Sequence, residues 1–221
     1  MTGDWRHMTR LIMVRHGESE TNLAGRLTGQ LDVDLTPAGR AQAAETAAFI
    51  LGKYRIDRIV SSDLHRAADT ARPVADTLGL EIETDSALRE MDMGLWQGLA
   101  FGELRQKYAE SWNRWREDIT EGRPDGGESI RETAERVYRA VDGIVSRYEG
   151  ENVLIMTHAA PVRIMICRAL GWPLGKIRRV DWVGNASVTE IVCEEGNWRF
   201  VSYTGTVPDG STKTLYEKDF L

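Results

Sequence analysis

Short apolar runs that alternate with helix-forming stretches are the feature that most restricts how this chain can fold. The runs at residues 10–16, 56–64 and 152–158 (RLIMVRH, IDRIVSSDL and NVLIMTH) have the length and composition of buried strands. Each is followed along the chain by a stretch that favours a helix. Alternating strands and helices predict an α/β fold: a three-layer α/β/α sandwich with a mainly parallel sheet covered by helices on both faces.

Local signals mark where several of these elements begin and end. Thr36 is suited to cap the first long helix, and Pro37 is suited to its first position. A short strand is expected at residues 80–85. Two strands within residues 187–204, joined by a tight EGN turn, predict an antiparallel pair near the C-terminus. Helices are expected at residues 37–52, 65–78, 129–148 and 161–171.

The segment from residue 88 to about residue 127 differs from the rest of the chain. It combines several aromatic residues with many charges and ends in the turn-rich stretch GRPDGGES. We expect it to be an excursion carrying one helix at about residues 101–117 and contributing to the cover of the active site predicted below. Nothing in the sequence suggests a linker or a repeat, so residues 1–221 are expected to form a single domain.

Composition excludes several classes of protein. The chain has 221 residues, 42% of them hydrophobic and 28% charged, the balance of an ordinary globular protein. Its net charge of −6 argues against a general nucleic-acid binder, and no apolar run is long enough for a membrane span. Cys167 and Cys193 lack the spacing of a zinc site or a disulfide framework. Since no apolar stretch of signal-peptide length begins the chain, a cytoplasmic location is expected.

Polar residues follow the predicted strands at their carboxyl ends. Arg15 and His16 end the first strand, His65 and Arg66 follow the second, and His158 ends the fourth. In a parallel sheet these ends meet along one edge, where ligands bind. Guanidinium groups match the geometry of phosphate oxygens, so this positive cluster in an acidic protein predicts a phosphoryl group as ligand.

An imidazole in such a cluster is able to react as well as bind. If neighbouring cations keep it neutral, it can attack phosphorus and form a phosphohistidine, while a carboxylic acid protonates the leaving oxygen. A zinc site is the alternative interpretation, since residues of ligand type occur nearby. No pair of them has the i, i+4 spacing of helical ligands, and two arginines would repel a dication, so neither a metal nor another cofactor is expected. The ligand types considered are His16, Glu18, His65, Asp92 and His158.

The motifs also occur in the order found in a known family. VRHGES, GQLDVDLTPAGRAQA, SSDLHRAADTA, LREMDMGLWQG, GGES and THAAPVR follow one another between residues 11 and 171. This ordered set resembles the histidine phosphatase superfamily, also called the phosphoglycerate mutase-like family. The three letters RHG alone would be a weak match, but the whole set with its intervening strands and helices is specific.

The resemblance implies a role for each residue of the cluster. His16 would accept the phosphoryl group, and Arg15, Arg66 and His158 would hold its oxygens. Glu90 would donate the proton to the leaving group. The family needs no metal.

Further residues are implied at the border of the substrate or depart from the family pattern. Asn22, Thr28 and Gly29 match positions that border the substrate in the mutase branch. Ala159 lies beside the substrate site where a glycine is usual, and its methyl group could narrow the pocket or shift the loop. Asp92 remains an alternative proton donor to Glu90. Two further departures, away from the proposed phosphate site, are Asp63 in place of a proline and Asp69 in place of a glutamine.

These residues predict a phosphomonoester hydrolase that acts on a small phosphorylated metabolite. Two alternatives stay open: a phosphoglycerate mutase-type transferase using the same residues, and a non-catalytic phosphate-binding or regulatory module. The fairly short segment 90–128 and the charged tail STKTLYEKDFL favour a phosphatase over a mutase, while the intact catalytic set argues against a binding module. An exposed last strand would be able to support a homodimer.

Overall fold

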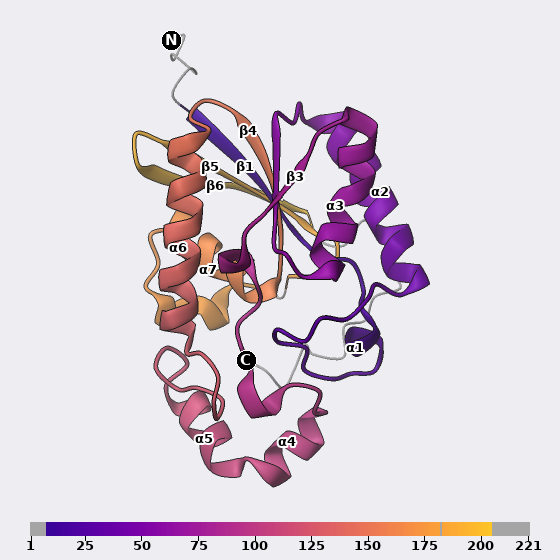
Figure 1. Cartoon of the computed structure of the whole chain (residues 1–221). Helices are drawn as coiled ribbons and strands as arrows, with labels where there is room; N and C mark the ends of the chain where they lie inside the picture. The colour runs from indigo at the N-terminus through magenta and orange to yellow at the C-terminus, as the bar shows by residue number, and fades with distance from the viewer. Residues whose placement is uncertain (1–7, 182, 205–221) are drawn as a thin grey trace.

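A six-stranded sheet forms the centre of the structure, a computed structural model that describes residues 8–181 and 183–204 (Figure 1). The strand order is β3-β2-β4-β1-β5-β6. The first four strands in this order are mutually parallel, β5 is antiparallel to β1, and β6 is antiparallel to β5. The predicted fold class is confirmed, including the antiparallel pair. The strands are β1 (Met8–Arg15), β2 (Arg58–Ser61), β3 (Ile82–Thr84), β4 (Asn152–Thr157), β5 (Val188–Glu194) and β6 (Asn197–Thr204).

Helices cover both faces of the sheet, as the alternating pattern predicted. α2 (Pro37–Lys53) and α3 (His65–Leu78) pack on one face, and α6 (Ile130–Arg147) and α7 (Ala159–Ala169) pack on the other (Figure 1). Thr36 caps α2 by accepting the Gly39 N–H, with Pro37 at the first helical position. β1 and β4 are buried on both faces, which explains their nearly continuous apolar sequences.

The excursion contains two helices where the sequence predicted one. α4 (Phe101–Lys107) and α5 (Ala109–Glu117) are separated at Tyr108, whose backbone angles of φ −129° and ψ 37° leave the helical region. The break redirects the chain so that Trp112 and Trp115 pack around Trp96, with ring centroids 5.6–6.2 Å apart. This tryptophan cluster gives the excursion an apolar interior continuous with the core around α6.

Short elements complete the chain and were not predicted. α1 (Glu20–Leu23) follows β1, and single 3-10 turns, η2 (Ser86–Leu88) and η3 (Gly94–Trp96), flank the segment that carries Glu90. A longer one, η4 (Leu174–Arg179), follows α7. None of these offers the periodic pattern by which longer elements are recognised.

Three expectations concern the edges and ends of the molecule. β6 lies at the edge of the sheet that the described residues form, so the homodimer remains a prediction for that edge. No helix in the described part of the chain is both long and apolar enough to cross a membrane. The charged tail at residues 211–221, whose sequence favours a phosphatase over a mutase, lies outside the described residues.

Candidate active site

The predicted cluster assembles at the carboxyl ends of three parallel strands. Arg15 ends β1, His16 follows it, and His158 follows β4. Arg66 lies in the first turn of α3, after β2. The imidazole rings of His16 and His158 have centroids 5.1 Å apart, and all four side chains are at least 97% buried. Four groups from three segments that are far apart in sequence therefore share one small volume.

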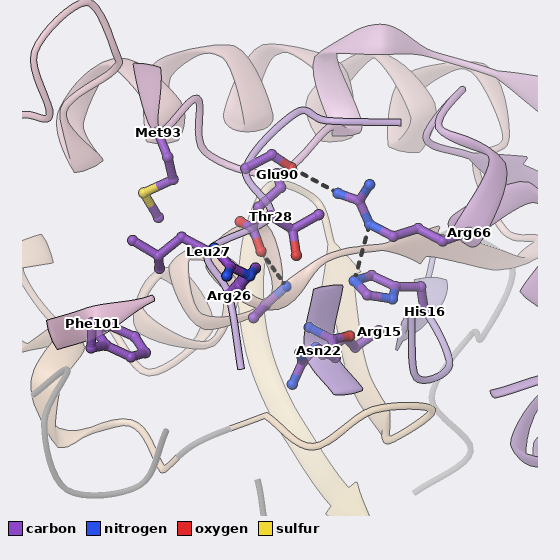
Figure 2. A pocket seen from close by; sticks show the side chains of 12 residues that line it. Arg15, His16, Asn22, Arg26, Leu27, Thr28, Arg66, Glu90, Met93 and Phe101 are labelled. Atoms are coloured by element: carbon purple, nitrogen blue, oxygen red, sulfur yellow. Dashed lines mark hydrogen bonds between the residues drawn. The ribbon is translucent and has the colours of Figure 1, made fainter. Parts of the chain in front are cut away.

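Hydrogen bonds determine which nitrogen of His16 faces the site. Nδ1 lies 2.7 Å from the Gly17 carbonyl oxygen, which can only accept, so Nδ1 carries the proton. Nε2 is 3.3 Å from Arg66 Nε, which can only donate, so Nε2 carries the lone pair. Figure 2 shows Nε2 directed at the Arg66 guanidinium. The ring is thus held as the tautomer in which Nε2 is available as a nucleophile.

The surroundings keep both imidazoles uncharged. Burial, followed by the positive charges of Arg66 and Arg15, lowers the pKa of His16 well below its ordinary value of 6.5. Burial and the charge of Arg66 likewise lower the pKa of His158. Burial lowers the pKa of Arg66 to about 10, which leaves its guanidinium cationic at neutral pH. The site therefore contains two positively charged guanidinium groups and two uncharged imidazole rings.

His158 has one ring nitrogen in contact with the protein and one without a partner. Nε2 lies 2.9 Å from Ser62 Oγ. Nδ1 is buried and has no hydrogen-bond partner among the described residues. A buried nitrogen of this kind is costly unless a ligand supplies the missing contact.

The loop that carries His16 is held by residues that sequence reasoning missed. Thr70 Oγ1 accepts the Gly17 N–H and donates to the Arg66 carbonyl, linking the two halves of the cluster. Asn185 Nδ2 donates to the His16 carbonyl and to Asn22 Oδ1. A Cβ at Gly17 would lie 2.5 Å from the Gly39 carbonyl oxygen, so this close approach requires glycine. Turn chemistry in GNAS (184–187) was the only available signal for Asn185.

A solvent-open cavity lies beside the cluster, and the space of about 470 Å³ within it includes part of its mouth. Its polar lining combines Arg15, His16 and Arg66 with Glu90, which comes from the excursion. The Glu90 carboxylate accepts the N–H groups of Met91, Ala159 and Ala160 at 2.9–3.1 Å. The rest of the lining is Asn22, Arg26, Leu27, Thr28, Gly29, Met93, Phe101 and Ala159 (Figure 2).

Asp92, the alternative proton donor, is directed elsewhere. Its Oδ1 accepts the Gly94 N–H at 2.8 Å and so closes the turn that begins η3. It does not line the cavity. The geometry favours Glu90, and its role as a proton donor stays a prediction.

Asn22, Thr28 and Gly29, expected at the substrate border, all line the cavity, whereas His158, expected to hold phosphoryl oxygens, packs against His16 without lining the cavity. Asn22 Oδ1 accepts the Ser19 N–H as well as the Asn185 amide, so its Nδ2 remains as the donor on that side chain. Thr28 Oγ1 is 2.6 Å from Thr21 Oγ1. Gly29 has φ +53°, and its carbonyl accepts from Arg66 Nη2. Their contacts with substrate remain predictions.

Ala159 occupies the first helical position of α7. It is buried, and its N–H donates to Glu90 Oε2. The backbone there is helical, a conformation that alanine adopts readily, so the methyl group that replaces the usual hydrogen does not interrupt the helix. The predicted shift of the loop is therefore not required, although the methyl group does line the cavity.

The zinc alternative receives no support from the described residues. His65 lies on the surface of α3 with its side chain 69% exposed, and its Nδ1 is 3.3 Å from Asp32. Glu18 accepts from the Thr36 hydroxyl at the start of α2. Within residues 8–181 and 183–204, no group of three or more His, Cys, Asp or Glu side chains is arranged to hold a metal ion.

Comparison with known proteins identifies a family match over most of the chain. The sequence profile of the histidine phosphatase superfamily (branch 1) matches residues 11–206. Phosphoserine phosphatase 1 of Hydrogenobacter thermophilus is 36% identical over 188 residues, covering 85% of this chain and 88% of that protein.

Solved structures have the same fold. A structure of Bacillus stearothermophilus YhfR superposes with a TM-score of 0.83 at 30% identity, covering 90% of this chain and 98% of that one. A mycobacterial glucosyl-3-phosphoglycerate phosphatase in complex with inorganic phosphate gives a TM-score of 0.76 at 32% identity, covering 90% of this chain and 97% of that one.

Proposed function

Because this chain belongs to the histidine phosphatase superfamily (branch 1), we propose that it hydrolyses phosphate monoesters through a phosphohistidine at His16. The observation that carries the proposal is the state of that imidazole. Its Nε2 is an unprotonated nitrogen beside a buried guanidinium, and its Nδ1 proton is held by the Gly17 carbonyl. A ring held only for structure has no need of an uncharged nucleophilic nitrogen at a cationic cavity.

The phosphate end of the site consists of Arg15, His16, Arg66 and His158. In the first step Nε2 of His16 attacks phosphorus, a P–N bond forms, and the bond to the leaving oxygen breaks. The arginines neutralise charge on the phosphoryl oxygens, and His158 Nδ1 gains the partner that it lacks. Phosphorylation makes the ring cationic, and the Gly17 carbonyl oxygen at Nδ1 stabilises that charge.

The leaving-group end of the site consists of Glu90 and the wall formed by Leu27, Met93 and Phe101. Glu90 in its acid form donates a proton to the departing oxygen and becomes a carboxylate. In the second step the carboxylate takes a proton from water as that water attacks phosphorus. The P–N bond then breaks, inorganic phosphate leaves, and His16 returns to its neutral form.

The lining of the leaving-group end supports hydrolysis over mutase chemistry. A mutase must hold a substrate with a second anionic group while excluding water. Among the described residues, the only further guanidinium lining the cavity is that of Arg26, which lies 3.2 Å from the Glu103 carboxylate and donates to the Gly98 carbonyl. The charge of Arg26 is thus already compensated, whereas the wall beside it is apolar. We infer a small phosphorylated metabolite as substrate and no requirement for a metal.

Phosphorus NMR of the purified protein tests the proposal. The panel contains phosphoserine, 3-phosphoglycerate with a trace of the bisphosphate, p-nitrophenyl phosphate and phenyl phosphate, each run with the unmodified protein and with His16→Ala. We expect inorganic phosphate from the unmodified protein alone. Acid-labile, base-stable label from a ³²P-phosphate ester should remain on the unmodified protein after denaturation, as phosphohistidine requires.

Three outcomes would change the assignment. Conversion of 3- to 2-phosphoglycerate without release of phosphate would make the protein a mutase. Phosphate release that survives His16→Ala would place the nucleophile elsewhere. If neither protein turns over any ester while both bind inorganic phosphate, the chain is a binding module.

A further inference from the structure

The segment that carries Glu90 has no regular secondary structure of its own, yet it must place a carboxyl group to within a fraction of an ångström. It lies between η2 and η3. We propose that Arg136 and Glu128 form a clamp that positions Glu90 as the proton donor. This inference rests on the proposed function, because it assigns Arg136 and Glu128 a role only if Glu90 protonates the leaving group.

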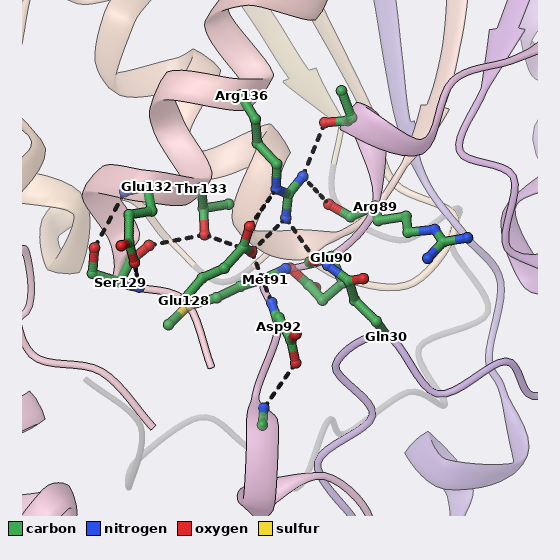
Figure 3. Close-up of polar contacts among 12 residues, drawn as sticks. Gln30, Arg89, Glu90, Met91, Asp92, Glu128, Ser129, Glu132, Thr133 and Arg136 are labelled. Atoms are coloured by element: carbon green, nitrogen blue, oxygen red, sulfur yellow. Dashed lines mark hydrogen bonds and ion pairs between the residues drawn. The ribbon is translucent and has the colours of Figure 1, made fainter. Parts of the chain in front are cut away.

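Arg136 uses all of its hydrogen-bonding capacity on this segment and on Glu128. Its Nη1 donates to the carbonyls of Ala87 and Arg89 at 2.9 and 2.8 Å, and its Nη2 donates to the Glu90 carbonyl at 2.7 Å. Nε and Nη2 donate to the two carboxylate oxygens of Glu128 at 2.7 and 2.8 Å. A guanidinium has five N–H donors, and five acceptors meet it here (Figure 3).

Glu128 binds the segment on the other side of Glu90. Its Oε2 accepts the Asp92 N–H at 2.9 Å and the Thr133 hydroxyl at 3.2 Å. Burial alone would raise the pKa of Glu128, yet hydrogen bonds from Arg136 and from the Asp92 N–H leave it below its ordinary value. The residue before Glu90 and the second residue after it are thus tied to one ion pair.

Two other side chains complete the restraint on this backbone. Thr157 Oγ1, at the end of β4, donates to the Leu88 carbonyl at 2.6 Å, and Gln30 Nε2 donates to the Glu90 carbonyl at 3.1 Å. Four successive carbonyls, from Ala87 to Glu90, are therefore each bound by a side chain. Arg136 supplies three of these contacts, so it has the largest share in fixing where the Glu90 side chain starts.

The clamp does not touch the substrate site itself. Arg136 and Glu128 do not line the active-site cavity, and their side chains are only 14% and 23% exposed. Their donors and acceptors are occupied by the protein. Arg136 is therefore a positioning residue that acts on the proton transfer through Glu90. Its charge also adds to burial and the other cations in lowering the pKa of His158.

The contacts of the Glu90 carboxylate make the reaction rate sensitive to the position of this segment. The Glu90 carboxylate is seated on the N–H groups that begin α7, at 3.1 Å each. A backbone displacement of about 1 Å would break these contacts, and a shift of that size at a reacting group is able to reduce the rate by about 100-fold. Lysine cannot replace the arginine here, because a single ammonium group lacks the planar fork that meets three carbonyls and a carboxylate.

The experiment measures how each variant responds to the leaving group. Rapid-quench single-turnover rates of phosphoenzyme formation are compared for p-nitrophenyl phosphate, which needs little protonation, and for phenyl phosphate, which needs more. We expect Arg136→Gln to lower the rate of phosphoenzyme formation by about tenfold or more with phenyl phosphate and by less than about threefold with p-nitrophenyl phosphate. The reason is that general acid catalysis contributes most to the departure of poor leaving groups. Glu128→Gln should show the same pattern at smaller size.

Matched controls separate positioning from folding. Arg139→Gln alters an exposed arginine three residues further along α6 and should leave both rates unchanged. Tm is measured for every variant. If Arg136→Gln does not fold, two other variants take its place. Glu128→Gln is isosteric and leaves the three carbonyl contacts of Arg136 in place. Arg136→Lys loses those contacts, and we expect both variants to show the leaving-group effect.

A double-mutant cycle decides the outcome. In a Glu90→Gln background, Arg136→Gln should add no further leaving-group-dependent loss, because the group it positions is absent. Full additivity, or equal slowing of both substrates by Arg136→Gln, would overturn the clamp while leaving the proposed function intact. If Glu90→Gln itself slows both substrates equally, both the clamp and the assignment of Glu90 are wrong.

Discussion

The phosphate end and the leaving-group end of this site are held by different kinds of structure. At the phosphate end, Arg15, His16 and His158 follow directly from the ends of β1 and β4, two buried neighbouring strands whose backbones pair with each other. At the leaving-group end, Glu90 lies on an irregular segment that is fixed by side chains from α6, β4 and the loop at Gln30. Backbone pairing places the strand ends at the phosphate end, where Thr70 and Asn185 add support to the His16 loop, whereas side-chain hydrogen bonds provide most of the positioning at the leaving-group end.

This difference predicts how far the effect of a single substitution extends at each end of the site. A strand in the centre of a sheet keeps its place when one side chain changes, so substitutions at the phosphate end should remove a chemical group and little else. A segment held largely by one arginine loses several contacts at once when that arginine changes. Effects at the leaving-group end should therefore spread from residues that never meet the substrate.

The largest expected effect is at the phosphate end. Arg66→Gln removes the buried guanidinium beside His16 Nε2, and we expect kcat/KM to fall by about 10³-fold, as when a preorganised donor to a developing anion is lost. Steady-state rates with p-nitrophenyl phosphate measure it. Arg72→Gln, an exposed arginine on the same helix, is the control and should retain full activity. A loss of less than tenfold for Arg66→Gln would contradict its place in the phosphate end.

The same contrast explains what the sequence was able to predict. His16 and His158 were predictable because an apolar run in the sequence identifies each buried strand. The parallel sheet then brings the residues at the ends of these strands to the same edge. The break at Tyr108 was not, because the helix-forming residues on either side of it show no interruption. Arg136 looked like any other charged residue on an amphipathic helix. Its function depends on which irregular segment packs beside it.

Thr70 and Asn185 show the same limit at the phosphate end. Each supports the His16 loop through one or two polar contacts with residues more than 50 positions away in the chain. Such contacts follow from the tertiary packing and leave no periodic or spacing signal in the sequence.

A second prediction tests the chemistry assigned to the leaving-group end. Glu90→Gln keeps the shape of the side chain and removes the acid, so phenyl phosphate should react about 100-fold more slowly and p-nitrophenyl phosphate only a few-fold more slowly. Single-turnover rates with both esters measure the difference. Glu117→Gln, at the exposed end of α5, serves as the matched control. Equal losses for both esters would return Asp92 to consideration as the donor.

A third prediction separates the two ends by their response to acid. His16 and His158 have pKa values in the folded protein that lie well below 6.5, so acid protonates them in the unfolded chain first. The free energy of unfolding should then decrease as the pH falls below about 6.5, by up to about 1.4 kcal/mol per pH unit for each histidine. Glu128 has a lowered pKa, so its contribution persists above its unfolded value near 4.5 and is lost only in stronger acid.

Urea unfolding between about pH 5 and 6.5 measures mainly the histidine contribution. His16→Ala should flatten the slope in this window by up to about 1.4 kcal/mol per pH unit, whereas Glu128→Gln should leave it nearly unchanged. An unaltered slope in His16→Ala would mean that the imidazole is not held neutral by its surroundings. The two ends would then not titrate in separate ranges.

The smallest expected effect concerns a residue that departs from the family pattern. Asp63 forms a bidentate ion pair with Arg89, the residue that precedes Glu90, and this pairing lowers the pKa of Asp63. Both side chains are about one-third exposed, so Asp63→Asn should cost less than about 1 kcal/mol in the free energy of unfolding. Because Arg136 already binds the Arg89 carbonyl, loss of the outer ion pair should leave the phenyl phosphate rate within about twofold. A tenfold loss with unchanged Tm would show that the clamp on Glu90 extends to its exposed side, and that the leaving-group end is held by two ion pairs and not by one.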